Sequence, residues 1–266
     1  MSTLELIIKG NLTEEAKALA DLEKLPDAPN PPPPPAAQPP AVVNLSNGFY
    51  QIDKARILAV TSPEYRKFLR ESGYGDLDSC SGIGFAKSVL RYDQSVRDAA
   101  ARAGLFHTGN DGDYVVNINH PDARKLIEAL GYKVPTVGLM YRLFIPYIKE
   151  LAQQNNPEAQ ATLKKMTDTK AEWLEDLVLN KSRLKIGTSE RTITLPDKDG
   201  SFDRTEINEF GYPSSVKGSG EFYHWHVSGD EIAAIRFRDS ELDLFLNGGP
   251  SIVVGWLGVR QSKIFP

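Results

Sequence analysis

EFYHWHVSGDEIAAIRFRDSELDLFLNGGPSIVVGWLGVR, residues 221–260, is a run of short segments in which apolar and polar residues alternate. A period of two is typical of β-strands that bury one face and expose the other. Gly, Asp, Asn and Pro stand between the segments, where tight turns favour them. The stretch therefore predicts a C-terminal series of short strands joined by turns.

The chain before this stretch has mostly helical patterns. Residues 62–74, SPEYRKFLRESGY, begin with a serine N-cap and a proline at the first helical position. Further helices are predicted for DQSVRDAAARAGL, HPDARKLIEALGY, TVGLMYRLFIPYIKELAQQ (bent or restarted at Pro146) and DTKAEWLEDLVLN. Strands are predicted for residues 48–61 and after Lys185. Helices early and strands late favour an α+β fold, with a small antiparallel sheet formed mostly by the C-terminal third.

Three domains are predicted from the composition. Residues 1–25 form an N-terminal arm with a short helix from Thr13, a plausible N-cap residue. Residues 26–42 are a proline-rich linker, which we expect to be an extended tether because proline fixes φ and supplies no amide donor. Residues 43–266 have the composition of a folded domain.

The charge balance bears on the class of partner. The chain has 31 Lys and Arg against 35 Asp and Glu, with a net charge of −4. The basic residues are dispersed, and no basic stripe of the kind that binds nucleic acid is visible. We therefore expect no nucleic-acid partner. The oligomeric state is left open.

Targeting signals and reactive groups are sparse. The longest apolar runs are too short and too interrupted to cross a bilayer, so no transmembrane segment is expected. No signal peptide is seen, which favours synthesis in the cytoplasm and leaves display on a virion or a surface open. Cys80 is the single cysteine and excludes an internal disulfide and a thiolate-rich zinc site.

Several short motifs carry a resemblance. A strand ending in Val60-Thr61 leads into a helix with Tyr65 and Phe68, which closes at Gly73-Tyr74. DTKAEWLED is similar to a Thr-Glu-x-Glu-Trp helix start, and LGVR to a terminal Gly-Phe-Arg strand. Together they resemble the formylglycine-generating-enzyme branch of the C-type lectin fold. The resemblance implies a C-type lectin-like domain over most of residues 43–266.

The same resemblance bears on activity. The enzymes of this branch work through a pair of cysteines late in the domain, whereas this chain has only Cys80, early. The chain is therefore expected not to be an enzyme. It looks more like the variable proteins of diversity-generating retroelements, whose C-terminal segment accepts replacement at solvent-facing positions. That likeness implies a diversifiable C-terminal surface, about residues 221–260, that recognises a protein or other macromolecular ligand.

A metal site is the alternative. Five residues separate Gly218 from His224, one separates His224 from His226 and four separate His226 from Glu231, as in the first cupin motif. On a strand the two histidines would share a face and could reach one ion. No histidine follows His226, and Arg238 stands where the motif needs glycine. A cupin-like metal-dependent enzyme stays the alternative, and the preferred interpretation has no metal and no cofactor.

Alternation divides the C-terminal strands into core-facing and outward rows. Aromatic, aliphatic and arginine residues on an outward row suit a binding surface, although another layer of the domain covering them would explain them as well. His224 and His226 join this surface as polar groups. The predicted ligand-binding residues are His224, His226, Arg236, Arg238, Phe245, Asn247, Ile252, Val254 and Trp256.

Overall fold

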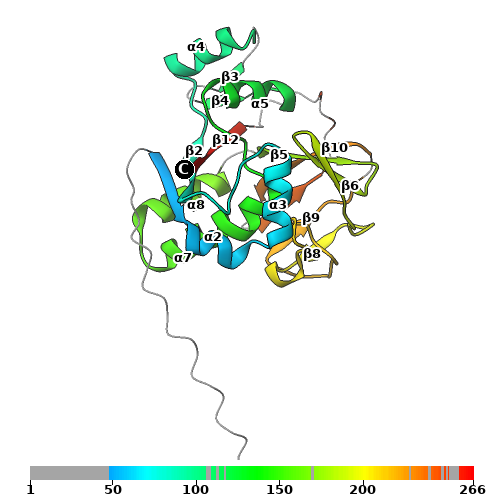
Figure 1. The fold of residues 1–266 in the computed structure, drawn as a ribbon. Helices are drawn as coiled ribbons and strands as arrows, with labels where there is room; N and C mark the ends of the chain where they lie inside the picture. The colour runs from blue at the N-terminus through cyan, green and yellow to red at the C-terminus, as the bar shows by residue number, and fades with distance from the viewer. Residues whose placement is uncertain are drawn as a thin grey trace, which may run out of the picture. The chain divides into compact units, whose positions relative to one another are not determined.

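The computed structural model describes most of the chain after residue 47. The described residues are 48–105, 109–111, 114–116, 118–168, 171–227, 229–238, 241–246, 249, 251 and 258–266. Val43–Pro266 is one compact unit, whose described strands and helices are shown in Figure 1. The predicted arm, residues 1–25, and the predicted linker, residues 26–42, lie outside the described residues.

Ten of the described strands form one sheet. Its order is β1-β2-β12-β5-β10-β11-β9-β8, and the β6–β7 hairpin extends from β5. β3 and β4 pair separately. The strands are β1 (Phe49–Asp53), β2 (Gly82–Val89), β3 (Gly109–Asp111), β4 (Tyr114–Val116), β5 (Glu172–Leu179), β6 (Arg183–Ile186), β7 (Ser189–Thr192), β8 (Gly200–Phe202), β9 (Phe222–His224), β10 (Glu231–Arg238), β11 (Glu241–Phe245) and β12 (Gly258–Phe265).

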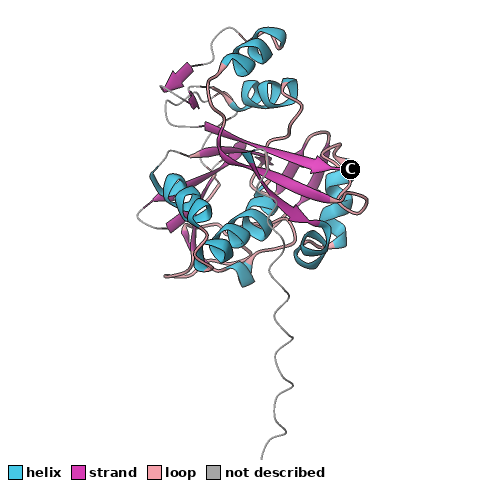
Figure 2. Cartoon of the chain, turned by 90° about the vertical axis from the view of Figure 1, so that its left-hand side faces the viewer, coloured by secondary structure: helices cyan, strands magenta, loops and turns pink. Residues whose placement is uncertain are grey.

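The helices lie on both sides of the strands (Figure 2). They are α2 (Lys54–Val60), α3 (Pro63–Glu71), α4 (Gln94–Arg102), α5 (His120–Ala129), α6 (Val137–Leu139), the π-helix η2 (Met140–Phe144), α7 (Ile145–Gln153), α8 (Pro157–Asp168) and the 3₁₀ turn η3 (Arg204–Glu206). None of the helices in the described part of the chain has both the length and the apolar character needed to cross a membrane.

The local signals for α3 and α5 are confirmed. The Ser62 side chain accepts a hydrogen bond from the Tyr65 amide (3.1 Å), and Pro63 stands in the first turn of α3. In α5 the Asn119 side chain caps the Asp122 amide (2.9 Å). Gly131 follows the helix with φ +79°, a conformation that glycine adopts without strain. Cap chemistry therefore fixed these two helices locally.

The α+β class is confirmed, but the predicted small antiparallel sheet is wrong. The sheet is large, and the early strands β1 and β2 belong to it. It is also mixed, because β9 pairs parallel to β11 and β12 pairs parallel to β5. The C-terminal strand β12 lies between β2 and β5, so the sheet joins distant parts of the sequence.

Two element predictions are corrected by the structure. Residues 54–60, expected as strand, form α2, because the Asp53 side chain caps the Arg56 amide (2.8 Å). DTKAEWLEDLVLN, expected as a helix, contains β5. β5 is buried on both faces along most of its length, so it lacks the alternation that marks a half-exposed strand.

Two separate cores pack on opposite faces of the sheet. One contains Leu174 of β5 and Ile235 of β10, with side chains from α3, η2, α7 and α8. The other contains the neighbouring residues Trp173 and Ala234, with side chains from α4 and α5. In Figure 1, α4 and α5 lie together above the sheet. The strands at the middle of the sheet are therefore covered on both faces.

A buried ion pair joins β12 to β5. Arg260 donates to both carboxylate oxygens of Glu172 (2.8 and 2.6 Å), and to the carbonyl of Ala86 on β2 (2.5 Å). The two charged side chains are 2% and 4% exposed. The guanidinium also lies over the ring of Phe144, 5.0 Å from its centroid. One side chain thus connects three strands of the sheet.

Candidate ligand-binding face

The register of β9, β10 and β11 decides which residues point outward. His224 stands opposite Leu244, and Leu244 opposite Ile235; Leu244 and Ile235 belong to the first core. One residue away, Tyr223 stands opposite Asp243, and Asp243 opposite Arg236. Successive residues of a strand point to opposite faces. Tyr223 and Asp243 are therefore on the face opposite the first core, which we call the outward face.

Two aromatic side chains lie together on the outward face. The rings of Tyr223 and Trp225 are 5.3 Å apart between centroids with an interplanar angle of 60°, and both side chains are partly exposed. The Trp225 amide donates to the Leu244 carbonyl (3.2 Å), so the pairing with β11 continues one step beyond β9. Ser201 of β8 stands opposite Tyr223 and is buried. The sheet backbone therefore holds the two rings in a fixed place.

The second core covers only part of the outward face. Ile232, Ala234 and Trp173 are buried under α4 and α5. No described residue of β8, β9 or β11 belongs to that core. The alternative that another layer covers the outward rows is thus correct for the middle of the sheet. At the β8–β9–β11 end, Tyr223 and Trp225 keep part of their surface open to a partner.

His224 does not lie on the outward face, contrary to the prediction. Its side chain is fully buried in the inward row beside Phe222 and Leu244. Burial lowers the pKa of His224 from 6.5 to about 4, although the backbone of Pro196 and the Asp199 carboxylate oppose the shift. The ring is therefore neutral at pH 7 and packs as a core residue. His224 is therefore not accessible to a ligand on the outward face.

His226 is exposed and bound to a neighbouring loop. Its ring Nδ1 lies 2.6 Å from the Asp199 carboxylate, and its backbone amide donates to the same oxygen (2.7 Å). These hydrogen bonds hold the pKa of Asp199 below its usual value. His226 thus fixes the end of β9 to the loop before β8, at the edge of the outward face.

The alternative metal ligands are not brought together. β10 meets the row of His224 at Ile235, four residues from Glu231. At about 3.3 Å per residue this puts Glu231 on the order of 13 Å further along the sheet, whereas zinc ligands lie within about 2 Å of one ion. His226 is already bound to Asp199. Among the described residues, no group of three or more His, Cys, Asp or Glu could hold a metal ion.

The remaining predicted residues are only partly placed. Arg236 and Arg238 lie on β10 in the outward register, and Phe245 lies on β11 in register with Ala234. The structure describes the backbone of these three positions. Asn247, Ile252, Val254 and Trp256 lie outside the described residues.

The predicted ligand-binding residues did not include Tyr223 and Trp225. In EFYHWH, the spacing of the two histidines suggests a ligand pair, whereas the same alternation as in the later strands also sorts its aromatic residues by face. Because Phe222 is apolar and faces the core, Tyr223 and Trp225 must face away from it. Alternation would therefore have found the two rings, whereas the burial of Asp243, 4% exposed, needed the structure.

The neutral state of His224 gives a pH prediction. The unfolded chain binds a proton near pH 6.5 and the folded chain only near pH 4. The His224 contribution to stability is therefore present above pH 6.5 and is lost as the pH falls to 4, by up to about 3 kcal/mol. We expect His224→Leu to fold and to lose this part of the acid sensitivity in urea unfolding. An NMR titration of the His224 ring with a midpoint near 6.5 would contradict the assignment.

Comparison with known proteins gives no family for this chain. No protein-family model, curated protein or solved structure matches it. The C-type lectin resemblance therefore stays an expectation from short motifs. The function is accordingly proposed from the site, and the observation on which it depends is the partly exposed aromatic pair held by β9 and β11.

Proposed function

We propose that this chain is a non-catalytic ligand-binding protein of C-type lectin-like fold, resembling the variable proteins of diversity-generating retroelements. Its ligand is a protein or another macromolecule, and its binding surface is the outward face at the β8–β9–β11 end of the sheet. The observation that supports this most is the Tyr223–Trp225 pair, partly exposed beside the outward positions Asp243 and Arg236.

The residue types of the outward face suit recognition. Tyrosine and tryptophan contribute large contact areas, and they lose little conformational entropy on binding because each has only two side-chain torsions. Arg236, opposite Asp243 in the register, is of the type that donates paired hydrogen bonds to carboxylates and carbonyls. A sheet face of this kind offers a broad surface, which fits a macromolecule better than a small substrate.

The backbone explains how such a surface tolerates replacement. The inward neighbours Phe222 and Leu244 are buried in the first core and hold the strands in place. Tyr223 and Trp225 are partly exposed and do not belong to that core, so their replacement changes the surface with little cost to the fold. A binding surface that is varied by replacement needs this separation of the two rows.

The two rings give the test of the proposed function. The labelled full chain is applied to an array of purified surface proteins and glycans, and the affinity for each retained ligand is then measured. We expect the Tyr223→Ala/Trp225→Ala variant to bind at least about 30-fold more weakly, because aromatic anchors at the centre of an interface contribute 2 kcal/mol or more.

Tyr92 provides the matched control. It is a partly buried aromatic residue outside the outward face, with Arg97 over its ring. Tyr92→Ala should keep the affinity of the unmodified chain. Equal affinities for the two variants, at unchanged thermal stability, would contradict the proposal.

A further inference from the structure

A second surface lies along β12, which β5 and β10 separate from β11 in the sheet, at the edge of β12 that does not pair with β2. The backbone amides of Lys133 and Ser262 each donate to the other residue's carbonyl (2.9 and 2.8 Å). Ser262 thus directs both of its backbone groups away from β2. In an antiparallel strand the direction of the backbone amide and carbonyl alternates from one residue to the next. The backbone groups of Lys263 therefore point toward β2, and those of Ile264 point toward the Lys133 side again.

Among the residues that the structure describes, no strand continues the pairing beside Ile264. The residue that would stand opposite it is Gly131, but Gly131 belongs to the turn that follows α5, and its amide donates to the Glu128 carbonyl (2.9 Å). The chain therefore diverges from β12 at this point. The space between the two segments is a pocket of about 620 Å³, lined by both of them and by Tyr74 and Gly75. The amide and carbonyl of Ile264 face this pocket.

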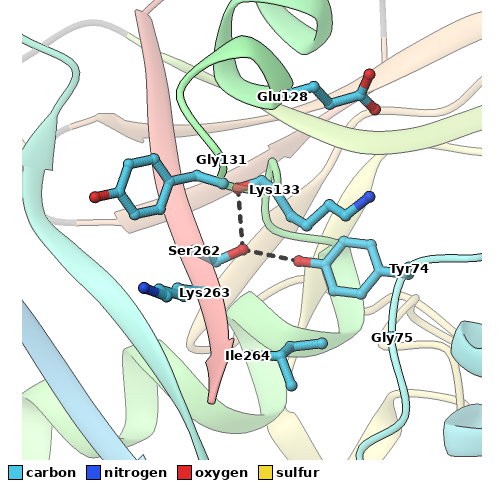
Figure 3. A pocket seen from close by; sticks show the side chains of 9 residues that line it. Tyr74, Gly75, Glu128, Gly131, Lys133, Ser262, Lys263 and Ile264 are labelled. Carbon is cyan, nitrogen blue, oxygen red and sulfur yellow. Dashed lines mark hydrogen bonds between the residues drawn. The ribbon is translucent and has the colours of Figure 1, made fainter. Parts of the chain in front are cut away.

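The pocket has one lysine on each side of β12. Figure 3 shows Lys133 and Tyr74 on one side of the strand and Lys263 on the other. Neither lysine forms an ion pair with a residue that the structure describes. Two carboxylates stand near the lysines: Glu128, which lines the pocket, and Glu175. Both are paired with Arg124, with 3.8 and 2.9 Å between Arg124 Nη2 and their Oε1 atoms. A ligand that carries carboxylates could therefore reach a lysine on either face of the strand.

The floor of the pocket is fixed by two hydroxyl groups. Ser262 Oγ donates to the Lys133 carbonyl (3.0 Å), which can only accept, and so the Tyr74 hydroxyl donates to Ser262 Oγ (2.9 Å). Both protons are used within the protein. The two hydrogen bonds join Lys133 and Tyr74 to β12 at Ser262.

We propose that this edge of β12 binds an extended acidic peptide segment of a partner protein, which adds as a short strand opposite Ile264. The peptide continues the pairing that Lys133 begins, and its carboxylates meet Lys133 and Lys263. Strand addition at an open edge uses backbone hydrogen bonds for affinity and flanking side chains for specificity. This site is separate from the outward face, so the proposal does not depend on the proposed function.

The test uses the full chain and the peptide acetyl-Val-Glu-Ile-Glu-Val-amide. Binding is followed by the NMR shift and hydrogen exchange of the Ile264 amide at peptide concentrations up to about 1 mM, the range for weak complexes. We expect this amide to shift and its exchange to slow. Lys133→Glu and Lys263→Glu should each weaken binding about five- to tenfold and favour the peptide with lysine in place of glutamate.

Three results would overturn the proposal. The first is no shift of the Ile264 amide at the highest peptide concentration. The second is equal binding of the same peptide with its central amides N-methylated, because strand pairing needs those donors. The third is displacement by an equal concentration of inorganic phosphate, which would identify a simple anion pocket. Circular dichroism of each lysine variant confirms that the charge reversals leave the fold intact.

Discussion

Arg260→Met should lower the free energy of unfolding by about 3–5 kcal/mol, because it leaves a buried carboxylate without its partner. Arg260 and Glu172 are both nearly inaccessible, and the guanidinium makes two hydrogen bonds to that carboxylate. Most domains are stable by only about 5–15 kcal/mol, so this loss is a large share. Urea unfolding followed by tryptophan fluorescence measures it.

Two further variants separate the buried charge from the lost contacts. Arg260→Met combined with Glu172→Leu removes both charges and should recover most of the stability, since apolar pairs replace buried ion pairs well. Arg183→Ala removes an exposed pair with Glu190 and should cost less than about 1 kcal/mol. A single Arg260→Met variant as stable as Arg183→Ala would show that this ion pair does not hold β12 in the sheet.

Asp176→Asn should change how stability depends on pH. Asp176 is fully buried on β5, and burial raises its pKa from 3.8 to about 8, although a hydrogen bond from the Val137 amide (2.7 Å) opposes the rise. The folded chain therefore keeps a proton that the unfolded chain has lost. Stability from this group is present below pH 4 and is lost as the pH rises to 8.

Asparagine mimics the protonated acid without this pH dependence. We expect the difference in unfolding free energy between Asp176→Asn and the unmodified chain to grow by about 5 kcal/mol in favour of the variant between pH 4 and pH 8. Glu175→Gln should remove a second, smaller part of the pH dependence of the unfolding free energy, below pH 7, because burial raises the pKa of Glu175 to about 7. Parallel curves for Asp176→Asn and the unmodified chain would contradict a buried neutral Asp176.

Much of the local structure could be predicted because it depends on local chemistry. The caps at Ser62 and Asn119 and the glycine after α5 act within one turn of a helix. The α7 start at Ile145, next to Pro146, matched the expected restart of that helix. By contrast, β2 and β5 are buried on both faces over much of their length, and such strands have no alternation to read.

For the candidate site, too, some features could be predicted from the sequence and others needed the structure. The outward placement of Tyr223 and Trp225 follows from alternation and was available in the sequence. The position of β12 between β2 and β5 was not, because it depends on contacts between distant segments. Nor could the sequence show that α4 and α5 cover Ala234 while leaving the β9 end open. The prediction placed His224 on the outward face because His224 and His226 together suggested a site. In the structure, the ring of His224 is buried in the inward row.

Sequencing many copies of this gene over codons 221–260 tests the central claim most directly. The claim is that the outward face binds ligands and is varied by replacement while the inward row maintains the fold. We predict substitutions at the outward positions 223, 225, 236 and 245, and constancy at the inward positions 222, 224, 235 and 244. Equal variation in the two rows, or constancy of Tyr223 and Trp225 together with His224, His226 and Glu231, would contradict it.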